Sequence, residues 1–229
     1  MKKWVAAIAV LSAMAFWGVD ARASVVYVDG TTQVIDGISR FNTSGNLMEG
    51  MEVTVTYSDS STETAFWEVI DYSSGGASGS GNNWSLLVTN DTYKISGSWN
   101  LWVDPTTPIE SIYLAGKAGN TFFDVYDGMG DTNDTPYSKW GWAFDTMYTG
   151  YDDSIVTATY YNLVAVDGHS AVGDLYEDLE VSFNSGSFSG DYIFNADTDN
   201  TNAVPVPATA LLLASGLIGI LGLTGRRSR

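Results

Sequence analysis

The feature that most constrains the fold is an alternation of apolar and polar residues with a period of two. It is clearest in Met51-Glu-Val-Thr-Val-Thr-Tyr57, where every second residue is apolar. This period is typical of a β-strand with one buried face. No part of residues 24–203 sustains an apolar pattern with a period of 3.6 residues, so we expect almost no helix there.

Similar short segments recur along the chain and are separated by turns rich in Gly, Ser, Asn and Asp. They lie at 64–70, 84–89, 98–103, 109–115, 121–126, 155–166, 180–183 and 192–194. This spacing predicts an all-β fold, a single antiparallel two-sheet sandwich of jelly-roll-like type, over residues 24–196. Residues 71–83 are predicted to be a Gly/Ser-rich loop, and residues 197–203 a polar linker.

Residues 1–23 have the pattern of a secretory signal peptide, with a helical apolar segment. A basic start, Met1-Lys-Lys3, precedes an apolar stretch, and Ala21-Arg-Ala23 is a small-x-small cleavage site before Ser24. This pattern predicts export through the Sec translocon and cleavage by signal peptidase.

Residues 204–229 form a three-part tail. It begins with Val204, Pro205, Val206, Pro207 and Ala208, continues as an uncharged run to Thr224, and ends with Arg226, Arg227 and Arg229. As a helix, the apolar run is roughly 26 Å long, just short of a hydrocarbon core of about 30 Å. The arginines would stay on the cytoplasmic side. The sequence therefore predicts a C-terminal transmembrane helix with the body outside the cytoplasm.

This tail resembles the PEP-CTERM sorting signal, which the membrane transpeptidase exosortase recognises. Val206 stands where that family has its central Glu, similar to a Val-Pro-x-Pro-Ala form of the signal. The resemblance implies a precursor anchored in the inner membrane with its body in the periplasm, then a cell-surface or extracellular protein. A plain single-pass anchor remains the alternative.

Several body segments also resemble secreted, β-rich PEP-CTERM proteins. They include residues 50–59, 99–102, 120–124, 172–176 and 196–200. The likeness implies a role with exopolysaccharide, biofilm or flocs, and it implies no catalytic residue.

The region between the targeting segments is strongly acidic. Residues 24–203 contain 26 acidic and four basic residues, a formal net charge of −22. Such a surface repels nucleic acid and anionic lipid, and it attracts divalent cations. The absence of cysteine excludes thiol catalysis and thiolate metal sites.

Calcium is the metal that the acidic loops would suit. Oxygen donors occur at Asp127, Asp131, Asn133 and Asp134, and again at Asp197 and Asp199. Calcium takes six to eight oxygen ligands, which flexible acidic loops can supply. Ordinary solvated turns are the alternative.

Three classes of function remain. The first is a non-catalytic envelope or matrix protein. The second is a carbohydrate-binding module that uses Trp140 and Trp142, although packing in the core is the alternative for these rings. The third is a secreted hydrolase, which would need facing carboxylates because His169 lies in a turn-like segment without a nucleophile motif. The sequence favours the first class, with no catalytic residues.

Overall fold

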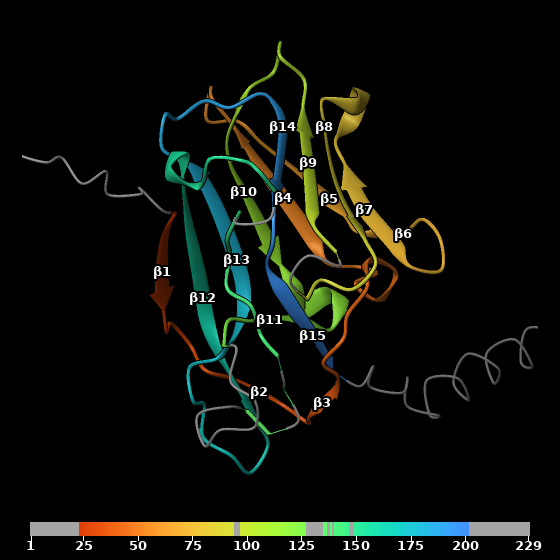
Figure 1. The fold of residues 1–229 in the computed structure, drawn as a ribbon, viewed down its shortest axis with the longest axis vertical. Helices are drawn as coiled ribbons and strands as arrows, with labels where there is room; N and C mark the ends of the chain where they lie inside the picture. The colour runs from red at the N-terminus through yellow and green to blue at the C-terminus, as the bar shows by residue number, and fades with distance from the viewer. Residues whose placement is uncertain are drawn as a thin grey trace, which may run out of the picture.

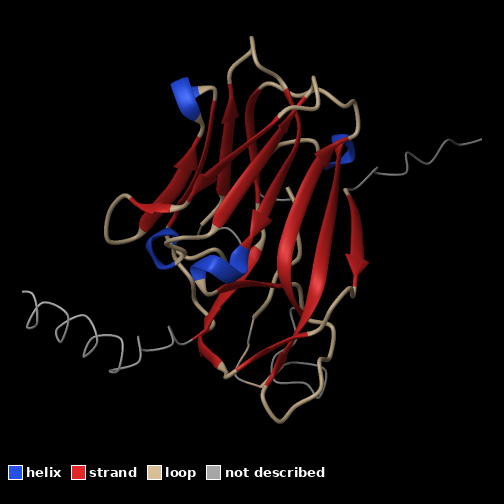
Figure 2. Ribbon diagram, turned by 180° about the vertical axis from the view of Figure 1, so that it is seen from behind, coloured by secondary structure: helices blue, strands red, loops and turns tan. Residues whose placement is uncertain are grey.

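The computed structural model describes residues 23–93, 97–126, 135–136, 138, 140–146 and 149–201, with the side chain of residue 153 excluded. Over these residues the protein is a two-layer β structure (Figure 1). The helical segments of the described part are short 3₁₀ turns, η1 (Gly45–Leu47), η2 (Ser80–Asn82), η4 (Gly116–Gly119) and η5 (Asp153–Ile155). Figure 2, from behind, shows the strands of both layers with such turns beside their ends. None of the helices in this part is long and apolar enough to cross a membrane.

The larger sheet has ten strands. They are β1 (Ser24–Val28), β2 (Gln33–Ile35), β3 (Ile38–Arg40), β4 (Glu52–Tyr57), β5 (Thr62–Phe66), β10 (Ile109–Ala115), β11 (Thr121–Asp124), β12 (Val156–Val166), β13 (Leu175–Phe183) and β15 (Asp197–Thr201). Seven follow the order β3-β15-β11-β13-β10-β4-β5, while β12 pairs with β13 and carries β1 and β2. The strand next to the predicted signal peptide, β1, therefore lies beside β12.

The smaller sheet has five strands in the order β14-β9-β8-β7-β6. They are β6 (Glu68–Val69), β7 (Ser74–Ser78), β8 (Trp84–Thr89), β9 (Trp99–Val103) and β14 (Gly190–Phe194). Its pairs are antiparallel. The order brings β14, from near the end of the described chain, against β9 from its middle.

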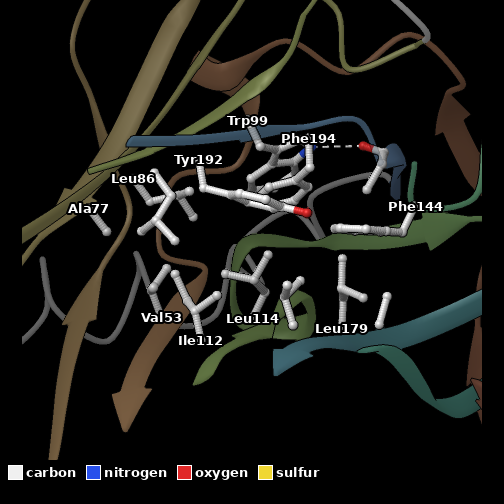
Figure 3. Packing of buried hydrophobic residues seen from close by; sticks show 14 of the residues in the cluster. Val53, Ala77, Leu86, Trp99, Ile112, Leu114, Phe144, Leu179, Tyr192 and Phe194 are labelled. Carbon is white, nitrogen blue, oxygen red and sulfur yellow. Dashed lines mark hydrogen bonds between the residues drawn. The ribbon is translucent and has the colours of Figure 1, made fainter. Parts of the chain in front are cut away.

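The core lies between the two sheets and follows the predicted alternation. In β9, Trp99, Leu101 and Val103 are buried, whereas Trp102 is 37% exposed on the other face. The larger sheet contributes residues such as Leu114, and the smaller sheet contributes Trp99 and Tyr192 (Figure 3). The coarse prediction of an all-β sandwich is confirmed.

Two details of the predicted strand pattern are wrong. The sandwich is mixed, because β1 and β2 run parallel to β12. Residues 71–83 contain the strand β7, and Gly75 in it is closely packed: a Cβ there would lie 2.2 Å from both the Gly45 carbonyl oxygen and Trp67 Nε1. Part of the Gly-rich segment 71–83 is therefore a strand, and η1 packs closely against it.

The predicted polar linker is also corrected. Residues Asp197–Thr201 form β15, which pairs with β11 and β3, and four of its five residues are buried. Its polar side chains find partners inside the protein; for example, Thr43 Oγ1 donates to Asn200 Oδ1 at 2.8 Å. The helices predicted at the two ends of the chain lie outside the described residues.

Candidate functional site

Three buried carboxylates meet where β11 ends and β15 begins. Asp124 is directly opposite Asp197 in the antiparallel ladder, and Asp199 lies two residues further along β15. Side chains two residues apart on a strand point to the same face, so the three carboxyl groups share that face. One oxygen of each lies within 4.8 Å of an oxygen of the other two. The exposed fractions are 0% for Asp124, 1% for Asp197 and 0% for Asp199.

Two hydroxyl groups donate hydrogen bonds to this carboxylate cluster. Ser138 Oγ lies 2.7 Å from Asp124 Oδ2 and also contacts Asp199 Oδ2. Thr92 Oγ1 lies 3.0 Å from Asp197 Oδ1. The other oxygen of Asp197, Oδ2, is buried without a hydrogen-bond partner among the described residues. Burying a carboxylate oxygen without a partner costs free energy unless a proton or a cation binds to it.

The segment 140–142 closes over the cluster through its backbone. The Trp142 amide donates to the Asp124 carbonyl, and the Trp142 carbonyl accepts from the Asp197 amide, both at 2.9 Å. Gly141 lies between Trp140 and Trp142, and a larger residue would not fit there because a Cβ would lie 1.9 Å from Asp124 Oδ1. The Gly in Trp-Gly-Trp therefore allows this segment to lie directly against the carboxylates.

The pKa of Asp197 in this cluster is strongly raised. Burial, and then the neighbouring charges of Asp199 and Asp124, raise the pKa of Asp197 well above its ordinary value. Three carboxylates this close cannot all stay ionised without compensation. The arrangement can therefore hold protons, or it can hold a hard cation through oxygen ligands.

The cluster includes only part of the predicted calcium set. Asp197 and Asp199 are brought together, whereas Asp127, Asp131, Asn133 and Asp134 lie outside the described residues. Asp124 was missed by the sequence reasoning. The available signal was the strand pattern of residues 121–124, whose register with β15 the sequence alone did not provide.

The two tryptophans predicted to bind carbohydrate, Trp140 and Trp142, are only partly exposed. Trp140 packs edge-on against Tyr93, with ring centroids 6.1 Å apart. Trp142 Nε1 donates to Asp145 Oδ2 at 2.5 Å. Both rings are of intermediate burial, so neither lies fully open on the surface.

The predicted processing residues fall almost entirely beyond the described part. Ser24 is the first residue of β1, and Ala23 packs partly against the core. Ala21 lies outside the described residues, as do Val204, Pro205, Val206, Pro207 and Ala208 and the arginines Arg226, Arg227 and Arg229.

A separate open pocket of about 710 Å³ lies beside β4 and β5, and most of its lining residues carry a hydroxyl, amide or carboxyl group. In it, Glu63 accepts hydrogen bonds from the Ser80 amide at 2.6 Å, Tyr57 Oη at 2.5 Å and Trp84 Nε1 at 3.1 Å. The bonds from Ser80 and Tyr57 lower the pKa of Glu63 to about 2. Hydrogen bonding within the Asp59 turn also lowers the pKa of Asp59, the pocket's other acid. These two carboxyls favour the ionised form, which suits hydrogen-bond acceptance better than proton donation.

A hydrolase would need facing carboxylates, and the consecutive acids of β13 do not face one another. Glu177 and Asp178 are consecutive in β13, so their side chains leave opposite faces of the sheet. Asp152 accepts from the Ser154 amide in an exposed turn. His169 lies in the exposed β12–β13 turn.

Comparison with known proteins adds no relative: no family model matches the sequence, and no curated protein or solved structure is similar enough to match it.

Proposed function

We propose that the chain is an exported, non-catalytic protein of the cell envelope or extracellular matrix, associated with exopolysaccharide or biofilm. In this proposal a signal helix directs export, and a C-terminal transmembrane helix holds the body at the inner membrane. An exosortase-like transpeptidase then processes the tail and releases the body to the surface or the medium.

The observation that carries the proposal is the position of the sandwich between the two sequence signals. The first strand begins at Ser24, directly after the predicted cleavage site, and the last ends at Thr201, just before Val204. Removal of residues 1–23 and of the chain beyond Pro207 would leave every described strand in place. The acidic body, with a formal net charge of −22, would stay soluble among like-charged polymers.

Intact-mass analysis of the protein recovered from cells tests this sorting route. We expect a mass that begins at Ser24 and ends near Pro207. A matched strain without the transpeptidase should yield protein that retains Arg229. If the released protein of normal cells also retained Arg229, exosortase processing would be excluded and the tail would be a plain anchor.

Carbohydrate binding is the second candidate, and the pocket beside β4 favours it. Tyr57, Glu63 and Asn83 line that pocket together with several hydroxyl groups, which is a surface able to hydrogen-bond a sugar. A jelly-roll-like sandwich, an arrangement also found among lectin domains, would be consistent with this role.

Calorimetric titration with polysaccharide from the producing cells tests this candidate. Asn83→Ala should weaken binding, whereas Asn46→Ala, which removes an amide from a different pocket, should not. Equal binding by both variants would exclude the pocket beside β4.

A further inference from the structure

The carboxylate cluster combines two observations that together indicate a ligand. Asp124, Asp197 and Asp199 present oxygens within 4.8 Å of one another in the interior. Independently, Asp197 Oδ2 is buried and lacks a hydrogen-bond partner among the described residues. Its neighbours in the cluster are themselves acids, which repel a negative charge rather than stabilise it.

We propose that Asp124, Asp197 and Asp199 bind one calcium ion between β11, β15 and the described residues 138 and 140–142. A divalent cation would reduce the formal charge of the three carboxylates from −3 to −1, and it would give Asp197 Oδ2 a partner. The proposal is independent of how the tail is processed.

The chemistry of the ligand atoms indicates which kind of metal ion would bind. It consists of three carboxylates with the Ser138 hydroxyl beside two of them. Such hard oxygen donors suit calcium or magnesium rather than zinc or copper, which favour imidazole or thiolate. The chain has no cysteine, and its one histidine lies in the β12–β13 turn.

Burial then favours calcium over magnesium. Magnesium usually keeps several of its waters and a near-ideal octahedron. These carboxylates are at most 1% exposed, and the Gly141 backbone lies directly against Asp124. Calcium accepts irregular coordination and can take two oxygens from one carboxylate. The cluster is thus better matched to the larger, less strictly coordinated ion.

The ion would act as a cross-link between elements that are distant in the sequence. Asp124 ends β11, Asp197 and Asp199 belong to β15, and Ser138 comes from the segment between β11 and β12. Calcium is scarce in the cytosol and abundant outside the cell. A chain that must cross the membrane unfolded would therefore gain this cross-link only after export.

The test is calcium binding and thermal unfolding of the full chain, purified in a non-ionic detergent and stripped with a chelator. At a calcium concentration about fifty-fold above the dissociation constant, we expect the melting temperature to rise by roughly 5–10 °C. Asp197→Asn should lose the rise and one bound ion per chain by calorimetry. Asp191→Asn removes an exposed acid on β14 and is the control that should keep both.

A second comparison distinguishes loss of calcium binding from a variant that simply does not fold. Without calcium, Asp197→Asn should melt at or above the temperature of the wild-type protein, because the substitution removes repulsion within the cluster. The proposal would be overturned by identical melting of the wild-type protein in calcium and in chelator. It would also be overturned if Asp197→Asn bound as many ions as the wild-type protein.

Discussion

Trp99 joins the two sheets, and its replacement by Phe tests how much that junction stabilises the fold. The indole stacks on Phe194 at 5.9 Å, meets Trp67 edge-on at 5.5 Å, and contacts Phe123 of the larger sheet at 6.2 Å. Its Nε1 donates to the Ala196 carbonyl at 2.8 Å, the dashed line in Figure 3. Ala196 lies between β14 and β15, so this bond fixes the crossing from one sheet to the other.

The expected loss can be worked from these contacts. Phe keeps most of the ring packing but leaves a cavity on the order of 40 Å³, which costs about 1 kcal/mol. The Ala196 carbonyl then loses its buried donor, at a cost of about 1–3 kcal/mol. We therefore expect Trp99→Phe to lower the free energy of unfolding by about 2–4 kcal/mol.

Urea unfolding of the full chain in detergent, followed by circular dichroism, measures this loss. Trp102→Phe on the same strand is the matched control; its ring is 37% exposed, and the loss should stay below about 1 kcal/mol. The slope with urea should be unchanged in both variants if the unfolding remains two-state. Equal losses in the two variants would refute the inference that Trp99 is a special contact between the sheets.

Four further substitutions, one of them a control, test other parts of the structure. Gly75→Ala should destabilise the protein by about 2–3 kcal/mol, because its Cβ would meet backbone of η1 and the Trp67 ring; Gly150→Ala, with open space around it, should cost only about 1 kcal/mol in urea unfolding. Gly141→Ala should displace Asp124 and abolish the calcium-dependent rise in melting temperature, and an unchanged rise would contradict the close approach of Gly141 to Asp124. The pKa of Glu63 is lowered to about 2 from 4.5, so the stability that its ionised form contributes is fully present above the pKa of the unfolded chain and is lost as the pH falls toward 2. Glu63→Gln should therefore lower the melting temperature near pH 7 and have a smaller effect near pH 3. An equal fall in melting temperature at both pH values would contradict this.

The strands with one buried face could be predicted because their chemistry is local. In β4 and β9, alternate residues face the core, and the period of two is visible in the sequence. The parallel pairing of β1 and β2 with β12 could not be predicted in this way. Pairing partners are chosen by the packing of distant segments, which the alternation does not encode.

The candidate site was only half predictable for a related reason. Asp197-Thr-Asp-Asn-Thr201 contains no apolar residue, and such segments usually form solvated turns. Here Thr43, Thr92 and Ser138 supply hydrogen bonds from elsewhere in the chain, so a fully polar strand is buried. The burial of this strand depends on donors that are distant in the sequence. Because of them, Asp197 and Asp199, which were expected in a polar linker, belong to a buried cluster of acids.

The placement of β15 has a mechanical consequence. Its C-terminal end, Thr201, leads toward the tail, and the strand is held by β11 on one side and β3 on the other. A pull on the tail directed along β15 would shear both ladders at once, so their hydrogen bonds would share the load instead of opening one after another. If the tail anchors the body as proposed, the drag of flowing water would load β15 in this shearing direction, in which the strand is hardest to separate from its neighbours.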